Sequence, residues 1–304
     1  MKKILEQYFP IMQRFPHRLA LWSRAKKLLT SSRHSTGHLK VTSCVLRAPV
    51  PQAAGKKILF LSDLHWFDSP DNWQLLEQIE VLAAKVAPDY IALGGDMVED
   101  ADRIGQLPPV LKRLRALAPV CVAIPGNWEV GKRWLKPDFW QKFYADCDID
   151  WLCNQSRQYG AIRFHGINDI SSGDCVLPEK NDPEIPATGT LPVAEVLLAH
   201  APDTVVALDE HQALRYYDAA LCGHTHGGQV RLPLFGALFC PSRYGRFFDR
   251  GAFSRSSYHL KMVVSSGLGK RDGSFRFFCR PEAIVLTFRP AHHYRLRHPQ
   301  TNGR

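Results

Sequence analysis

Short apolar runs, each bounded by glycine, proline or aspartate, recur along most of the chain and constrain its fold more than any other feature. Each run is about four to eight residues long and rich in Val, Ile, Leu and Phe, the pattern of buried β-strands. In order they are LKVTSCVL, KKILFLS, DYIALGG, PVCVAIPG, AIRFHG, AEVLLAH, DAALCGH, HLKMVVSSG and EAIVLTF. So many buried strands require one or more sheets at the centre of the fold.

Helix-like segments separate the early runs, near residues 73–86, 105–117 and 138–146. Strand and helix therefore alternate in the first half of the chain, and strands follow one another more closely in the second half. This order predicts an α/β sandwich with more than one sheet and with the helices outside. Residues 171–192, rich in Pro, Gly and Ser, are predicted to form a long surface loop or an insertion beside the site.

The positive charge of the chain is concentrated at its N-terminus. The net charge is +10, but residues 1–57 hold twelve Lys and Arg against one acid, Glu6, which leaves the rest of the chain at −1. Tight duplex binding relies on several Lys or Arg contacts to phosphate, so the near-neutral body argues against a stable nucleic-acid partner. A basic, aromatic lead segment favours an anionic membrane surface as partner instead.

Residues 16–30 have the pattern of a basic amphipathic helix. Such a helix either lies in a membrane interface or packs on the body of the protein with a solvated basic face, and both interpretations stay open. We therefore predict a membrane-associating helical extension at residues 1–36, a domain at 37–290 and a basic tail at 291–304.

The predicted location is the cytoplasm, peripheral on the inner face of the cytoplasmic membrane. No uncharged stretch approaches the roughly 18 to 20 apolar residues of a membrane-spanning helix. The first thirty residues lack the apolar core and cleavage site of an export signal. The eight cysteines include no C-x-x-C pair and are typical of buried free thiols in a reducing compartment.

Polar side chains follow five of the predicted strands at the point where each strand ends. The residues able to bind a metal there are Asp63, His65, Asp96, Asn127, His200, His224 and His226. Because ligands of α/β sheets bind outside the carboxyl ends of the strands, these side chains are expected to converge. Seven ligands are too many for one divalent ion beside its substrate and waters, so the pattern predicts a pair of ions.

The types of ligand indicate the chemistry. Carboxylate, imidazole and amide groups without a thiolate favour Mn²⁺, Fe²⁺, Zn²⁺ or Co²⁺ over a structural zinc site, and Mn²⁺ is the expected ion. A carboxylate such as Asp96 can bridge two cations roughly 3.5 to 4 Å apart, the separation at which both clamp one phosphoryl group. The predicted reaction is hydrolysis at phosphorus.

The motifs Asp63-x-His65, Gly95-Asp96, Gly126-Asn127, His200 and Gly223-His224-x-His226 resemble the five ordered motifs of the calcineurin-like metallophosphoesterases. The resemblance covers roughly residues 56 to 290 and implies a four-layer α/β/β/α sandwich. It also implies that one ion is held by Asp63, His65 and His226, the other by Asn127, His200 and His224, with Asp96 as the bridge. Catalytic roles fall to Asp96, Asn127 and His200. The stretch after the last motif is similar to a bacterial subgroup of phosphodiesterases, many of them membrane-associated.

Trp128 departs from the pattern of the family, which usually continues Gly-Asn with a histidine that assists the leaving group. An indole N–H donates a hydrogen bond but cannot exchange a proton near neutral pH. Either the substrate has a leaving group that needs little help, such as a nucleotide phosphate, or the protein is a non-catalytic metal-binding membrane scaffold. Retention of all seven ligands favours the enzyme.

The sequence is also similar to the UDP-2,3-diacylglucosamine pyrophosphatases of lipid A synthesis, one branch of which lacks the same histidine. A lipid-linked pyrophosphate fits the basic N-terminus and a group of aromatic residues near the motifs, namely Trp66, Phe67, Trp73, Trp128, Trp134, Phe139 and Trp140. A broad-specificity phosphodiesterase without lipid preference is the alternative. Trp128, Arg243 and Arg246 are predicted to contact the substrate, and Glu129 to orient the site through a hydrogen bond.

Overall fold

The computed structural model describes residues 37–131, 135, 138–170, 175–176, 193–210, 217–254, 261–270 and 275–290, the side chains of 209 and 210 excepted. The predicted extension at 1–36, the tail at 291–304 and nearly all of the predicted loop at 171–192 lie outside these residues. The statements made about them above stay predictions.

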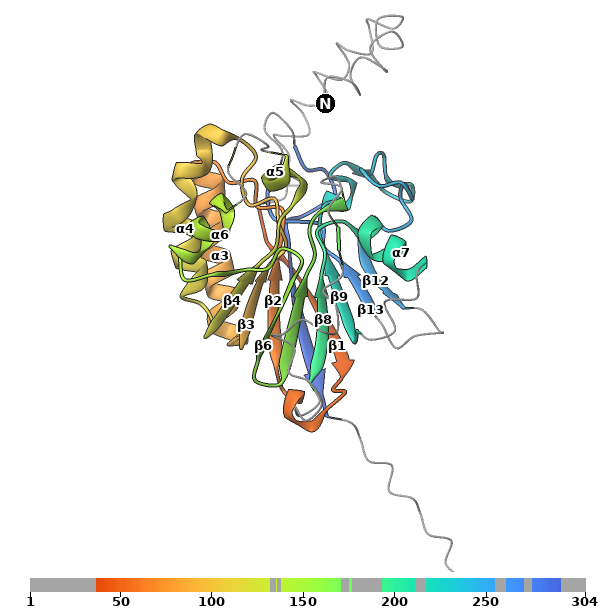
Figure 1. Ribbon diagram of the computed structural model, residues 1–304. Coiled ribbons are helices and arrows are strands. Elements are labelled where there is room, and N and C mark those ends of the chain that lie inside the picture. The colour runs from red at the N-terminus through yellow and green to blue at the C-terminus, as the bar shows by residue number, and fades with distance from the viewer. Residues whose placement is uncertain are drawn as a thin grey trace, which may run out of the picture.

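Two sheets lie at the centre of the described structure (Figure 1). The first has the order β1 (Lys40–Arg47), β14 (Glu282–Arg289), β2 (Lys57–Leu61), β3 (Tyr90–Leu93), β4 (Val120–Ala123) and β5 (Asp150–Trp151). The second has the order β12 (Gly251–Ser254), β13 (Lys261–Val264), β9 (Ala219–Cys222), β8 (Ala194–Leu198), β7 (Ile162–Gly166) and β6 (Gln155–Tyr159). Strands β2 to β5 are parallel, as are β7, β8, β9 and β13, so their carboxyl ends share an edge within each sheet.

Helices cover both outer faces of the pair of sheets. Figure 1 shows α3 (Pro70–Val86), α4 (Leu107–Arg115) and α6 (Phe139–Ala145) on the first sheet, and α7 (Pro202–Glu210) on the other side of the molecule. This is the four-layer α/β/β/α sandwich that the family resemblance implies. Among the helices of the described residues, none combines the length and the apolar character needed to cross a bilayer.

Helix α3 begins three residues earlier than the apolar pattern predicts. The Ser69 side chain accepts a hydrogen bond from the Asn72 backbone N–H at 3.3 Å and caps the helix. Pro70 occupies the first turn, where its missing N–H costs nothing. The predicted helix near 105–117 is a 3-10 turn at Ala101–Gln106 followed by α4.

The core consists of apolar layers on both faces of each sheet. Strand β2 shows the arrangement, because Leu59 and Leu61 pack under the helices while Ile58 and Phe60 pack between the sheets. A third layer lies between the second sheet and α7 and includes Val205. Burial on both faces explains why the strands are continuously apolar in sequence rather than alternating.

Two of the aromatic residues that lie near the motifs in sequence belong to the apolar core. Trp66 and Trp140, the latter on α6 itself, are buried in the cluster between the first sheet and α3, α4 and α6, where Trp73 and Phe139 also pack. Trp134 lies outside the described residues. All eight cysteines lie in the described residues, none of them forms a disulfide, and five are buried, as the sequence predicts for most of them.

Candidate metal centre

The loops that follow β2, β3 and β9 turn sharply just where the candidate ligands stand. Asp63, His65, Asp96, His224 and His226 all have positive φ angles, between 44° and 68°. Few non-glycine residues adopt this conformation, and it is a source of local strain that clusters at functional sites. The turn after β2 thus brings Asp63 and His65, two positions apart, into one group of candidate ligands.

Asp63, His65 and His226 form the first group of candidate ligands, and each offers an atom within 4.8 Å of the others. The Nε2 atoms of His65 and His226 are 3.1 Å apart, and His226 Nε2 lies 3.6 Å from Asp63 Oδ1. All three side chains are buried. Asp63 and His65 follow a strand of the first sheet, whereas His226 follows a strand of the second.

Asp96, His200 and His224 form the second group, again within 4.8 Å of one another. Asn127 belongs with them, because its Oδ1 lies 2.9 Å from His224 Nδ1 and 3.2 Å from His200 Nε2. The two imidazole nitrogens are 3.3 Å apart. Asn127 opens the short helix α5 (Asn127–Val130), which the sequence analysis did not predict.

Asp96 lies between the two groups. Its Oδ2 atom is 3.3 Å from His200 Nε2 and 3.7 Å from His65 Nε2. Its other oxygen accepts a hydrogen bond from the Trp128 backbone N–H at 2.9 Å. The structure therefore brings together all seven predicted ligands, with Asp96 at the position a bridging carboxylate would occupy.

Glycines beside the ligands leave room for the carboxylates. A Cβ at Gly126 would overlap Asp96 Oδ1, and a Cβ at Gly223 would overlap Asp63 Oδ2. Neither glycine is needed for its backbone angle, because neither has a positive φ. The Gly-Asn and Gly-His pairs are thus explained by close packing against the carboxylates.

Neighbouring groups hold the ligands in place. The Glu129 carboxylate accepts hydrogen bonds from the backbone N–H groups of Asp96, Met97 and Gly126 at 2.9 to 3.0 Å, which ties two ligand loops together. His200 Nδ1 lies 2.7 Å from the Gly94 carbonyl oxygen, a contact that leaves Nε2 as the nitrogen available to a metal.

Burial and neighbouring charges set the protonation states of the cluster. Burial raises the pKa of Asp63 to about 6, although His200 opposes the rise. Burial also acts to raise the pKa of Asp96, but the charge and hydrogen bond of His200 outweigh it and lower that pKa to about 2. Burial lowers the pKa of His224 and His226. Ionised carboxylates and neutral imidazoles are the forms that bind a divalent ion.

The donor set fits two divalent ions. Nitrogens bound about 2.0 to 2.1 Å from one ion at tetrahedral or octahedral angles lie about 2.9 to 3.4 Å apart, which brackets both observed imidazole pairs. Asp63, His65 and His226 would hold one ion, Asn127, His200 and His224 the other, with Asp96 shared. A pair of divalent ions supplies Lewis acidity toward phosphoryl oxygens and lowers the pKa of a water molecule.

The predicted substrate contacts stand at different distances from this cluster. The Trp128 ring is half-buried and its centroid is 6.5 Å from that of His65. Arg243 and Arg246 are exposed on a turn of the second half of the chain. The Arg246 guanidinium donates to the carbonyls of Phe235 and Ala237, and the Arg243 backbone N–H donates to Asp203. Substrate contact by these three residues stays a prediction.

Arg276 is a buried neighbour of the cluster that the sequence analysis did not identify. Its Nη2 lies 3.3 Å from His226 Nδ1, and its Nε donates to the Gly269 carbonyl at 2.8 Å. No local pattern marks this residue, since 50 positions separate it from His226.

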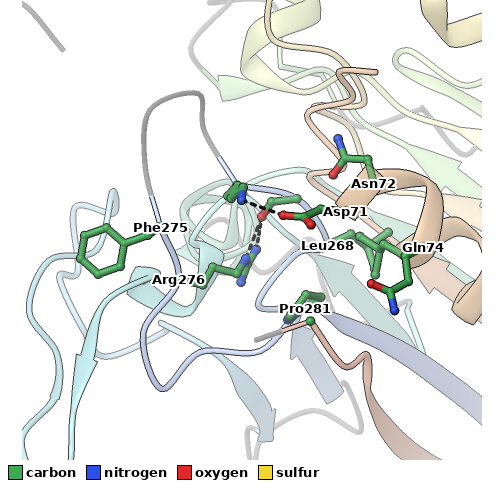
Figure 2. Close-up of a pocket in the computed structure, with 11 residues that line it drawn as sticks. Asp71, Asn72, Gln74, Leu268, Phe275, Arg276 and Pro281 are labelled. Atoms are coloured by element: carbon green, nitrogen blue, oxygen red, sulfur yellow. Dashed lines mark hydrogen bonds and ion pairs between the residues drawn. The ribbon is translucent and has the colours of Figure 1, made fainter. Parts of the chain in front are cut away.

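A pocket of about 330 Å³ adjoins Arg276, between α3 and the chain that follows β13 (Figure 2). Figure 2 shows Asn72 and Gln74 of α3 on one wall and Arg276 on another. None of the seven candidate ligands, all of them described, lines this pocket. It is therefore a neighbour of the metal centre rather than part of it.

Comparison with known proteins agrees with this geometry. The profile of the calcineurin-like phosphoesterase family matches residues 56–228, a span that contains all seven candidate ligands. The chain is 30% identical over 243 residues to "Phosphodiesterase YaeI" of Escherichia coli (strain K12), covering 77% of this chain and 82% of the relative. It is 27% identical over 252 residues to "Uncharacterized metallophosphoesterase YkuE" of Bacillus subtilis (strain 168), covering 77% and 79%.

A solved dimetal phosphatase from Danio rerio is 10% identical with a TM-score of 0.46, covering 77% of this chain and 99% of that one. So distant a likeness adds no argument. The family profile spans more than half of the chain and all of its ligand loops. The chain therefore belongs to the calcineurin-like phosphoesterase family and is a hydrolase of phosphoester bonds.

Proposed function

We propose that the chain hydrolyses the pyrophosphate bond of a lipid-linked nucleotide, with UDP-2,3-diacylglucosamine as the leading candidate. Trp128 is the observation that carries the proposal, because it stands directly after the ligand Asn127 and its indole cannot act as a general acid. A nucleotide phosphate leaves a pyrophosphate with little protonation. The alkoxide of a simple monoester needs more assistance.

Two divalent ions are the proposed cofactors, Mn²⁺ first, with Fe²⁺, Zn²⁺ and Co²⁺ also suited to carboxylate, imidazole and amide ligands. We propose the cytoplasmic face of the membrane as the place of action and residues 1–36 as the attachment to an anionic lipid surface. The near-neutral body supports this partner over a nucleic acid.

Phosphorus NMR of the products tests the proposed substrate. Full-length, manganese-loaded protein is incubated with UDP-2,3-diacylglucosamine in detergent, and the expected product is UMP. A chelator and the substitution Asp96→Asn are expected to abolish its release. Asp102→Asn is the matched control, since Asp102 is exposed outside the ligand loops. Absence of UMP while a chromogenic phosphodiester is still hydrolysed would contradict the lipid-linked substrate.

That outcome would support the second candidate, a broad-specificity phosphodiesterase without lipid preference. The E. coli relative named as a phosphodiesterase favours this candidate. The intact set of seven candidate ligands argues against a non-catalytic scaffold. Hydrolysis that survives Asp96→Asn would refute the two-metal mechanism.

Deletion of residues 1–30 tests the attachment. The truncated protein is expected to partition less to anionic liposomes than the full chain does, because the deletion removes seven basic residues. Unchanged partitioning would refute the proposed role of this segment.

A further inference from the structure

Exposed large apolar side chains are concentrated in one stretch of the described chain. Seven of them fall within residues 232–247, and we call them the hairpin patch: Leu232, Leu234, Phe235, Leu238, Phe239, Tyr244 and Phe247. Leu234 is fully exposed, and Phe235 and Phe247 are 73% and 71% exposed. Scattered single apolar residues are normal on a surface, but a concentration of large exposed apolar side chains in one segment is typical of an interaction site.

The backbone holds these side chains outward. Strands β10 (Arg231–Leu232) and β11 (Gly236–Ala237) pair in an antiparallel hairpin with Leu234 and Phe235 at its tip. The Arg246 guanidinium donates to the carbonyls of Phe235 and Ala237 and so joins the turn that carries Tyr244 and Phe247 to the hairpin. The two segments that carry the patch are therefore held together by hydrogen bonds.

The patch is also positively charged. No acidic residue occurs between Gly228 and Phe248, whereas three arginines do. Arg231 pairs with Asp249 at 2.5 Å, but Arg243 and Arg246 are exposed beside the apolar tips. Exposed leucine and phenylalanine side chains with two exposed arginines in the same segment match the boundary between acyl chains and anionic headgroups.

The patch is joined directly to the metal-binding loop. A Cβ at Gly228 would overlap Ala237, so hairpin and loop are in close contact. Arg231 Nη1 donates to the Gly227 carbonyl at 2.7 Å, next to His226 in the chain. A surface bound by the hairpin would thus lie against the element that supplies two candidate ligands.

We propose that the hairpin patch docks on an anionic lipid bilayer and holds the metal centre at its surface. The proposal rests on the proposed function in one respect, that the substrate resides in the same membrane. A second copy of the chain is a poorer occupant, because a two-fold interface would bring the exposed Arg243 and Arg246 of both copies together, and residues 228–248 hold no acidic residue to pair with them. Residues 1–36 are excluded by the same reasoning, since they too are basic.

Flotation of the full-length protein with vesicles tests the proposal. Vesicles of phosphatidylcholine with phosphatidylglycerol are compared with vesicles of phosphatidylcholine alone. The double substitution Leu234→Ser with Phe235→Ser is expected to lower binding to the anionic vesicles at least about tenfold, because it removes both side chains at the tip. Val81→Ser is the matched control, since Val81 is 71% exposed on α3, and its binding is expected to equal that of the unsubstituted chain.

Thermal unfolding checks that the double variant is folded. Its unfolding midpoint is expected to stay close to that of the unsubstituted chain, because substitutions of exposed residues change stability little. Unchanged vesicle binding by the double variant would overturn the proposal. So would a change from dimer to monomer in sedimentation with vesicle binding retained, which would assign the patch to a second copy. Flotation requires no turnover, so hairpin-dependent binding without UMP release would refute the proposed substrate and leave the docking surface standing.

Discussion

Single atoms decide how closely the carboxylate ligands approach their neighbouring loops. Because a Cβ at Gly223 would overlap Asp63 Oδ2, Gly223→Ala is expected to displace the carboxylate from the first ligand group. We predict a loss of about 10- to 100-fold in Mn²⁺ affinity, the usual effect of disturbing a ligand's support, and a comparable fall in kcat/KM. Isothermal titration calorimetry and steady-state kinetics measure the two.

Gly105→Ala is the control for that change, because nothing lies within 4 Å of a Cβ at Gly105 and its φ is ordinary. It is expected to leave metal affinity and kcat/KM unchanged. Full Mn²⁺ affinity in Gly223→Ala would contradict the packing argument.

At the same scale, Trp128 restricts which leaving groups the site can expel. General acid catalysis contributes about 10²- to 10⁴-fold where it operates. Trp128→His is therefore predicted to raise kcat/KM for a phosphodiester with an alkyl leaving group at least about tenfold relative to one with a nitrophenyl leaving group. Trp128→Phe supplies no proton and should leave the ratio of the two kcat/KM values unchanged. An equal rise of this ratio in Trp128→His and Trp128→Phe would rule out proton donation as the cause.

At the scale of elements, one carboxylate adds side-chain hydrogen bonds to the parallel pairing of β1 with β14. Glu282 accepts hydrogen bonds from Lys40 Nζ at 2.5 Å, from Thr42 Oγ1, and from the Ser266 backbone N–H at 2.8 Å. Burial alone would raise the pKa of Glu282, but these donors outweigh it and hold the pKa below its usual value. The carboxylate thus connects the edge strand β1 to the loop after β13.

This linkage gives a pH dependence of stability. Because the folded pKa lies below the unfolded value of about 4.3, the stabilisation is present above that pH and is lost as the pH falls through the folded pKa. Thr42→Val removes one donor and is predicted to move acid unfolding to a higher pH. Thr42→Ser keeps the hydroxyl and should unfold like the original chain. Circular dichroism during acid titration measures both, and coincident curves for Val and Ser would contradict the prediction.

At the scale of the whole molecule, each candidate ion would join the two sheets. Asp63, His65, Asp96 and Asn127 follow strands of the first sheet, whereas His200, His224 and His226 follow strands of the second. A ligand that binds only the folded state stabilises it, by about 2.7 kcal/mol at a concentration one hundred times its Kd. Metal binding therefore opposes separation of the sheets.

We predict that Mn²⁺ raises the thermal unfolding midpoint and that a chelator lowers it again, as measured by scanning calorimetry. Ca²⁺ prefers oxygen ligands and should raise the midpoint less. Asp96→Asn is expected to lose most of the Mn²⁺ effect because both ion positions share that carboxylate. An equal rise in Asp96→Asn and the original chain would place the bound Mn²⁺ elsewhere.

The sequence by itself determined nine of the strands and the set of candidate ligands, whereas the four layers were implied by the family resemblance. The nine strands and the ligands are local signals, since a strand is recorded in its own apolar residues and a ligand in the position where that strand ends. An error of a few residues in a predicted helix boundary does not change which residues are predicted as ligands. Helix α3, for example, begins at Pro70 rather than near residue 73, and the predicted ligands are the same.

Only the tertiary structure decided which residues are buried in the core, which are exposed and which contact the candidate ligands. Arg276 reaches His226 across 50 positions, and Trp66 and Trp140 are buried in a core cluster that also holds residues as distant in sequence as Leu268 and Val285. The exposed tip of the β10–β11 hairpin could not be predicted from the sequence either, because its leucines and phenylalanines have the composition of a buried strand. Burial is a property of residues brought together from distant positions, and no window of sequence contains both partners.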